Sequence, residues 1–196
     1  MTLQDWQELL NNRRTIRLFA QDTVTRPQLE CLLDAARMAS CGANLQRLRY
    51  TVVTSKALVD AILPHTAWAA LVKPRRTPQL HVSAPTAWIA VHASAELASN
   101  PIIHADAGAA IQSMELAAAV QGLGCCWLAS VDKEEVGKLI GLPADRKILY
   151  AVAVGHPAET PCSENVANPA QISYYLDSQD RLHVPKLSVD ALTEWR

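Results

Sequence analysis

Residues 103–130 read IHADAGAAIQSMELAAAVQGLGCCWLAS and combine the pattern of a long apolar helix with that of an apolar strand. From residue 103 to residue 121, apolar or small side chains occupy almost every position of a helix. Gly122 suits the end of that helix, because glycine readily takes the left-handed backbone conformation found there. Residues 123–130 then have the pattern of an apolar strand. A helix without a polar face needs apolar cover on all sides, so we expect it to be central, buried within the chain or at a dimer interface.

The same stretch does not predict a membrane span. Four polar residues interrupt the apolar segment 105–131, whereas a span needs about 18 uninterrupted apolar residues. They are Asp106, Gln112, Glu115 and Gln121. The chain of 196 residues has 18 Lys+Arg and 19 Asp+Glu and a formal net charge of −1, which excludes a broad attraction to nucleic acid or an anionic membrane. The five cysteines form no C-x-x-C pair and the N-terminus has no secretory pattern, so we expect a cytoplasmic protein.

Helical and strand patterns alternate around this stretch. A capping box at Thr25 and Gln28, with Pro27 in the first turn, predicts a helix that ends near residue 38. Further helices are expected over residues 2–12, 55–63 and 132–141, strands over 50–54, 85–93 and 148–154, and extended runs over 171–177 and 182–185. This order predicts one α+β domain over residues 1–196, with layered helices and strands. Residues 65–84 have no sustained period and predict an irregular insertion, a candidate lid, and residues 171–196 form a C-terminal extension.

A basic segment follows the first helix. Arg13, Arg14 and Arg17 lie within five residues, together with the hydroxyl of Thr15. Guanidinium groups bind phosphate through paired hydrogen bonds, and a hydroxyl adds a compact donor. The segment therefore predicts a phosphate site, and the alternative interpretation is a solvated basic turn.

A second candidate is the loop after the second helix, residues 40–46, which read SCGANLQ. Its small residues allow close approach of the backbone, and the amides of Asn44 and Gln46 both donate and accept hydrogen bonds. Such amides suit the polar edge of a heteroaromatic ring. The alternative interpretation is an ordinary polar loop at a helix exit.

The Gly-x-Gly at Gly122 and Gly124 follows a helix and precedes a strand, which is the reverse of the dinucleotide-binding arrangement. Cys125 and Cys126 lie among apolar residues of a strand, so we interpret them as small buried side chains and not as nucleophiles. The six histidines show no metal-binding spacing, and no metal site is predicted. His104 and Asp106 near the helix start are interpreted as a charge-and-cap arrangement.

Taken together, these segments resemble the nitroreductase-like family of FMN-dependent flavoenzymes. Residues 13–19, RRTIRLF, resemble the element of that family which holds the FMN phosphate and reaches the flavin edge. Residues 41–46, CGANLQ, resemble a loop that contacts the flavin of the other subunit. Residues 122–128, GLGCCWL, resemble the strand that lies against the flavin ring, and the sequence V-P-K ending at Lys186 resembles a last phosphate contact.

The resemblance covers about residues 5–190 and implies a three-layer fold with a mainly antiparallel central sheet flanked by helices. The long helix would lie at the interface of a homodimer with shared FMN sites. The cofactor-binding residues that it implies are Arg13, Arg14, Thr15, Arg17, Cys41, Asn44, Gln46, Cys126, Trp127, Leu128, Ala129 and Lys186. Thr15 and Cys41 stand where the family usually has Ser, Arg47 where it has Pro, and Ala129 where it has Gly.

The implied activity is that of an oxidoreductase which takes electrons from NAD(P)H by ping-pong hydride transfer. The acceptor would be a nitroaromatic compound, a quinone, an enone or a free flavin. No side chain is assigned as an acid or base, because solvent can supply the protons. A protein that carries or senses FMN without turnover is the alternative, and NAD(P)H oxidation with such an acceptor discriminates between the two.

Overall fold

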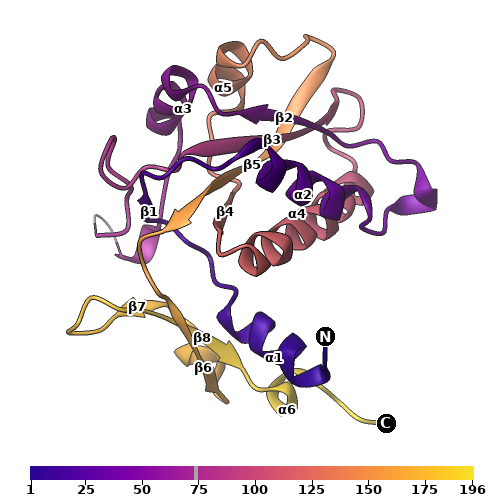
Figure 1. The fold of residues 1–196 in the computed structure, drawn as a ribbon. Helices are drawn as coiled ribbons and strands as arrows, with labels where there is room; N and C mark the ends of the chain where they lie inside the picture. Colours follow the sequence, from indigo (N-terminus) through magenta and orange to yellow (C-terminus); the bar gives the residue numbers. More distant parts are fainter. Residues whose placement is uncertain (73–74) are drawn as a thin grey trace.

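The computed structural model describes residues 1–72 and 75–196, and it contains three layers around one antiparallel sheet (Figure 1). The sheet has the order β1-β5-β3-β2, and β4 also pairs with β5. Its strands are β1 (Phe19–Ala20), β2 (Arg49–Val53), β3 (Ala87–Ser94), β4 (Gly124–Leu128) and β5 (Arg146–Pro157). Every pairing among them is antiparallel, as expected from the family resemblance.

Helices cover both faces of this sheet. The α-helices are α1 (Leu3–Asn12), α2 (Arg26–Arg37), α3 (Lys56–Ile62), α4 (Pro101–Val120), α5 (Lys133–Leu139) and α6 (Val189–Leu192), and short 3-10 turns η1 to η4 span Gly42–Asn44, Leu63–His65, Ala70–Val72 and Pro169–Gln171. Helices α2 and α4 share one core cluster with the sheet, and α3 and α5 share the other. Successive residues of β3 face opposite clusters, since Ile89 belongs to the first and Trp88 to the second.

Local sequence signals account for most element boundaries. Thr2 and Gln28 complete the capping boxes that begin α1 and α2, and the side chain of Asp132 accepts the amide of Glu135 at the start of α5. Gly122 has a φ of 70°, which fits its predicted place after α4. No helix of the described residues combines the length and the apolar character needed to cross a membrane.

Helix α4 is less enclosed than its apolar sequence predicts. One face packs on the sheet and on α2, where residues such as Ile111 and Met114 are fully buried. Its other sides are partly exposed to solvent in a single chain, because Ile102 is 57% exposed and Val120 is 67% exposed. We therefore still expect a second subunit to pack against the exposed apolar side chains of α4.

Residues 162–187 form a second small sheet, which joins part of the C-terminal extension to a strand that precedes it and lies below the main body in Figure 1, beside α1. Its strands are β6 (Cys162–Val166), β7 (Tyr175–Leu176) and β8 (Leu182–Leu187). Strand β6 pairs with β8 in parallel, and β7 pairs with β8 in the antiparallel sense, within the two extended runs expected over residues 171–177 and 182–185. The sequence pattern did not predict β1 or β6, because a two-residue strand and a polar strand carry little apolar alternation.

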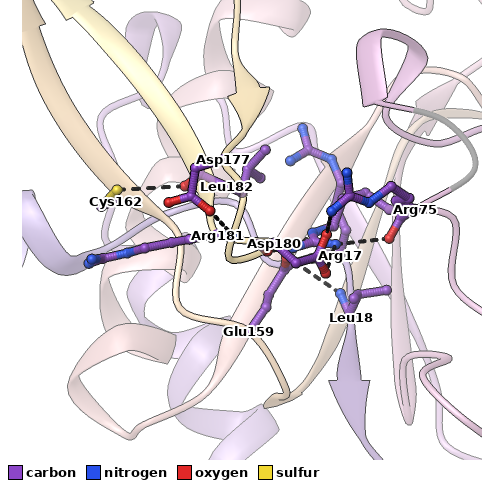
Figure 2. A network of polar contacts seen from close by, with 10 residues as sticks. Arg17, Leu18, Arg75, Glu159, Cys162, Asp177, Asp180, Arg181 and Leu182 are labelled. Carbon is purple, nitrogen blue, oxygen red and sulfur yellow. Dashed lines mark hydrogen bonds and ion pairs between the residues drawn. The ribbon is translucent and has the colours of Figure 1, made fainter.

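A buried ion pair between Arg76 and Glu159 lies where the small sheet meets the main body. Figure 2 shows Glu159 and Asp180, which belong to this network. The Nε atom of Arg76 lies 2.7 Å from Oε2 of Glu159, and both side chains are about 5% exposed or less. The other oxygen of Glu159 accepts the backbone amides of Arg17 and Leu18, at 2.5 and 3.1 Å. Arg76 also pairs with Asp180 in the β7–β8 turn.

The irregular segment 65–84 is therefore anchored at two points. Trp68 is 3% exposed and packs against Trp88, with 6.0 Å between the ring centroids, and Arg76 is held by Glu159. Between these anchors, residues 73 and 74 lie outside the described part of the chain. The role of the segment as a lid stays a prediction.

We expect Arg76→Ala to lower the free energy of unfolding by about 3–5 kcal/mol, because it leaves the buried carboxylate of Glu159 without its partner. Arg75→Ala is the matched control. Arg75 is exposed and pairs only with Asp180 among the described residues, so its loss should cost about 1 kcal/mol or less. Denaturant unfolding of the two variants measures the difference, and equal losses would contradict the assigned role of the Arg76–Glu159 pair.

Candidate functional site

The basic segment after α1 lies alongside the start of β4. Thr15 forms a parallel bridge with Cys125, and the amide of Ile16 donates to the Cys125 carbonyl at 2.9 Å. A Cβ atom on Gly124 would lie 2.5 Å from Cγ1 of Ile16, so only glycine permits this approach. Gly124 therefore allows the basic segment to pack directly against the strand, and this explains the second glycine of the Gly-x-Gly sequence.

Arg13 is held by a carboxylate from the middle of α4. Its Nη1 atom lies 3.0 Å from Oε2 of Glu115. Burial raises the pKa of Glu115 above its ordinary value, and the charge of Arg13 opposes that rise. The Nε atom of Arg13 is buried and has no hydrogen-bond partner among residues 1–72 and 75–196. This donor remains available to a bound group.

Three cations from opposite ends of the chain share one surface. Arg14 donates to the last carbonyls of α1, those of Leu10 and Asn11. Burial lowers the pKa of Arg14, and the charge of Arg13 lowers it further. The pKa of Lys186 is also lowered, first by burial and then by Arg14 and Arg13. Neighbouring positive charges repel one another, and a bound anion relieves this repulsion. The surface is therefore suited to bind an anion.

A cavity of about 390 Å³ opens beside these groups, between α1, α4 and the end of β5. Arg13, Arg14, Glu115 and Cys125 are among the residues that line it. The side chain of Arg17 takes a different direction, because its guanidinium lies over the ring of Tyr174, 5.3 Å from the ring centroid.

The loop of residues 41–46 is fastened to the other half of α4. The amide of Gly42 donates to Oδ1 of Asp106 at 2.8 Å, and a Cβ atom on Gly42 would lie 2.8 Å from Ile102. Ala43, Asn44 and Gln46 have φ values of 49°, 54° and 45°. A non-glycine residue in the left-handed region is disfavoured, and strain of this kind is typical of functional loops.

The amides of this loop are presented to solvent. Asn44 and Gln46 are exposed, and Gln46 Nε2 donates to Asn44 Oδ1 at 3.1 Å. Cys41 lies near the same oxygen, at 4.0 Å. Cys41 and Gln46 line a separate cavity of about 190 Å³ with Asp106.

A single chain does not bring the loop and the arginines together. Asp106 binds the loop and Glu115 binds Arg13, and these two acids are nine residues apart on α4. Their attachment points are therefore separated by about 14 Å along the helix axis. The predicted site residues form two half-sites, the basic half-site (Arg13, Arg14 and Lys186) and the amide half-site (Cys41, Asn44 and Gln46).

The end of β4 contributes exposed and buried residues in alternation. Cys126 and Leu128 are buried, whereas Trp127 is 38% exposed and Ala129 is exposed. The Trp127 ring meets Tyr150 edge to face, at 5.1 Å between centroids. Burial raises the pKa of Cys126 to about 12 and the pKa of Cys125 well above its ordinary value. Both thiols are therefore protonated near neutral pH, which fits their interpretation as small buried side chains.

Sequence reasoning missed the acidic residues that position the site, namely Asp106, Glu115 and Glu159. A signal existed for two of them, because Asp106 and Glu115 are acids within an otherwise apolar helix. The interpretation of His104 and Asp106 as a cap was wrong. Asn100 caps α4, while His104 bonds Tyr150 and Asp106 binds the loop.

Comparison with known proteins places this geometry in a family. The family model described as "Nitroreductase family" matches residues 10–156. The oxygen-insensitive NADPH nitroreductase of Salmonella typhimurium (strain LT2) is 29% identical over 169 residues, which cover 79% of this chain and 66% of that protein.

Solved structures agree with this match in fold. The NfrA1 nitroreductase of B. subtilis has a TM-score of 0.66 at 21% identity, with 89% of this chain and 76% of that chain covered. An FMN-dependent nitroreductase from Clostridium difficile R20291 has a TM-score of 0.62 at 19% identity, with 84% and 93% covered. The matched segment includes the basic segment, the amide loop, α4 and β4, and the chain belongs to the nitroreductase family.

Proposed function

We propose that the protein is a cytoplasmic, FMN-dependent NAD(P)H oxidoreductase that reduces small electron acceptors such as nitroaromatic compounds, quinones, enones or free flavins. The observation that carries this proposal is the convergence of Arg13, Arg14 and Lys186 on one surface. Burial and the charge of Arg13 lower the pKa of both Arg14 and Lys186. A bound dianion would stabilise these cations, and a phosphate monoester supplies that charge.

The donors of the basic half-site fit the FMN phosphate. The buried Nε atom of Arg13 is a donor without a partner among the described residues, and Glu115 fixes the direction in which that guanidinium points. Arg14 is fixed in turn by the carbonyls at the end of α1. Groups held in this way lose little side-chain entropy when an anion binds. Lys186 would add a third charge from β8.

The remaining residues would orient the flavin ring. The Thr15 hydroxyl follows the phosphate donors along the chain, and the backbone of Cys126 to Ala129 would lie against the ring. Arg17, whose guanidinium lies over Tyr174, is assigned to neither half-site. The amides of Asn44 and Gln46 would bind its polar edge, since a flavin pyrimidine ring presents both donors and acceptors.

Bound FMN would supply the hydride chemistry, taking electrons from NAD(P)H and passing them to the acceptor in a ping-pong sequence. The protein would bind, orient and shield the reactants. No side chain needs to act as an acid or base, because solvent can protonate the reduced acceptor. Two of the similar proteins described above, an NADPH nitroreductase and an FMN-dependent nitroreductase, support this assignment.

The separation of the half-sites along α4 favours a homodimer with two shared sites. The amide half-site of one subunit would complete the basic half-site of the other, and the partner would cover the ends of α4 that are exposed in a single chain. A two-fold axis produces two such composite sites at once.

The absorption spectrum of the purified protein tests the cofactor assignment. We expect a yellow protein that releases about one FMN per subunit on heating, and steady NAD(P)H oxidation when a quinone or nitroaromatic compound is added. A colourless protein that takes up no added FMN would contradict the assignment. Bound FMN without turnover would identify a carrier or sensor instead.

We expect Arg14→Gln and Lys186→Gln each to raise the dissociation constant for FMN by about 10- to 100-fold, because a hydrogen bond to a charged group contributes about 1.5–3 kcal/mol. Quenching of flavin fluorescence during titration measures this constant. Arg26→Gln is the matched control, since Arg26 is an exposed arginine of α2 that pairs with Glu30. Unchanged affinity in both variants would place the phosphate elsewhere.

Paired variants test the shared site. In a heterodimer of one Arg14→Gln subunit and one Asn44→Ala subunit, one composite site has both substitutions and the other has neither. We expect such heterodimers, isolated with two different tags, to bind one FMN with the affinity of the unsubstituted protein. Each homodimeric variant should bind weakly at both sites. A heterodimer without a tight site, or a monomer in sedimentation, would contradict the model.

A further inference from the structure

A cysteine, a histidine and an aspartate meet on the small C-terminal sheet, outside both half-sites. The Sγ atom of Cys162 on β6 lies 3.5 Å from Nδ1 of His183 on β8, its register partner in the parallel pair. The other ring nitrogen, Nε2, lies 3.0 Å from Oδ2 of Asp177, which follows β7. A nucleophile, a base and a group that orients the base are thus within hydrogen-bond reach of one another.

The aspartate determines which nitrogen of the imidazole can accept a proton. Its Oδ1 atom accepts the amides of Gln179 and Arg181, so the carboxylate is fixed by its own turn. The Arg181 amide and the His183 ring lower the pKa of Asp177. A charged Oδ2 favours the proton on Nε2 of His183, and Nδ1 is then free to accept the thiol proton.

Two further side chains lie against the imidazole of His183. Oε2 of Glu164 lies 3.6 Å from Nδ1 of His183, and the Tyr175 ring stacks on the imidazole at 4.8 Å between centroids. The Tyr175 hydroxyl donates to the same Glu164 carboxylate. The guanidinium of Arg14 is close enough for its charge to interact with Cys162.

The thiol can be reached from solvent. Cys162 is half-buried and lines a cavity of about 400 Å³, and its Sγ also lies 3.8 Å from the Leu182 carbonyl (Figure 2). Polar side chains dominate the cavity wall, among them Asn11, Asn12, Ser163, Asn165 and Arg181. Such a wall suits a small reagent that both donates and accepts hydrogen bonds. Cys125 and Cys126 are more deeply buried, at 4% and 2% exposed.

We propose that Cys162 is a nucleophilic thiol that reduces hydroperoxides, with His183 as its base and Asp177 as a positioning residue. His183 accepts the thiol proton, and the sulfur attacks the distal oxygen of ROOH. The S–O bond forms as the O–O bond breaks, and the proton passes to the leaving alkoxide. The thiol is oxidised by two electrons to a sulfenic acid, and the hydroperoxide is reduced to an alcohol, or to water when it is hydrogen peroxide.

The test measures sulfenic acid at individual cysteines of the full-length protein. Hydrogen peroxide is added without NAD(P)H, so that no electrons reach a bound flavin, and a 1,3-dione traps sulfenic acids for peptide mass spectrometry. Cys31, an exposed cysteine of α2, is the internal reference. We expect Cys162 to be trapped at least about tenfold faster than Cys31, and His183→Asn to remove that advantage. Cys162→Ser should yield no adduct at this position.

Two variants of Asp177 separate orientation from structure. Asp177→Asn keeps an oxygen for the turn amides but presents an amide to His183, which favours the wrong tautomer. We expect slower trapping in Asp177→Asn and recovery in Asp177→Glu, with equal circular dichroism. A trapping rate at Cys162 no higher than at Cys31 would overturn the proposal. Unchanged rates in both His183→Asn and Asp177→Asn would overturn it too.

Discussion

Two buried carboxylates on the central helix α4 hold the two chain segments that form the candidate site. Helix α4 is apolar along most of its length, yet Asp106 binds the amide of Gly42 and Glu115 binds the guanidinium of Arg13. A buried acid needs a partner, so each carboxylate fixes one chain segment at a defined height on the helix. The rise of the helix then sets the distance between the two half-sites. Other features, such as the glycine at 124 that admits Ile16, adjust the segments that these acids hold.

Much of the fold follows from signals that act over a few residues. The capping box of α2, the helix expected over residues 132–141 and the glycine after α4 were predicted, because each depends on neighbours in sequence. Strands β1 and β6 were not predicted. Their pairing depends on partners far along the chain, as in the parallel match of Cys162 with His183. The sequence pattern at such positions has no period of its own.

The candidate site shows the same limit. The arginines, the amide loop and Lys186 were identified from residue type and family resemblance, and the structure places Lys186 with Arg13 and Arg14. The partner that holds Arg13 was not identified, since nothing near residue 13 in sequence indicates Glu115. Asp106 was misassigned as part of a cap for a related reason. An acid at the start of a helix usually interacts with local amides, but here a distant loop supplies the amide.

The ion pair between Arg76 and Glu159 also constrains the order in which the molecule is assembled. Glu159 accepts the amides of residues 17 and 18 and binds Arg76, and Arg76 in turn holds the turn at Asp180. Contacts between such distant positions form late in folding, because long loops must close first. On the ribosome, residues 13–17 emerge long before residues 180–186 are synthesised. The basic half-site is therefore completed only after β8 has been synthesised, and a nascent chain without β8 lacks the Lys186 side chain of that half-site.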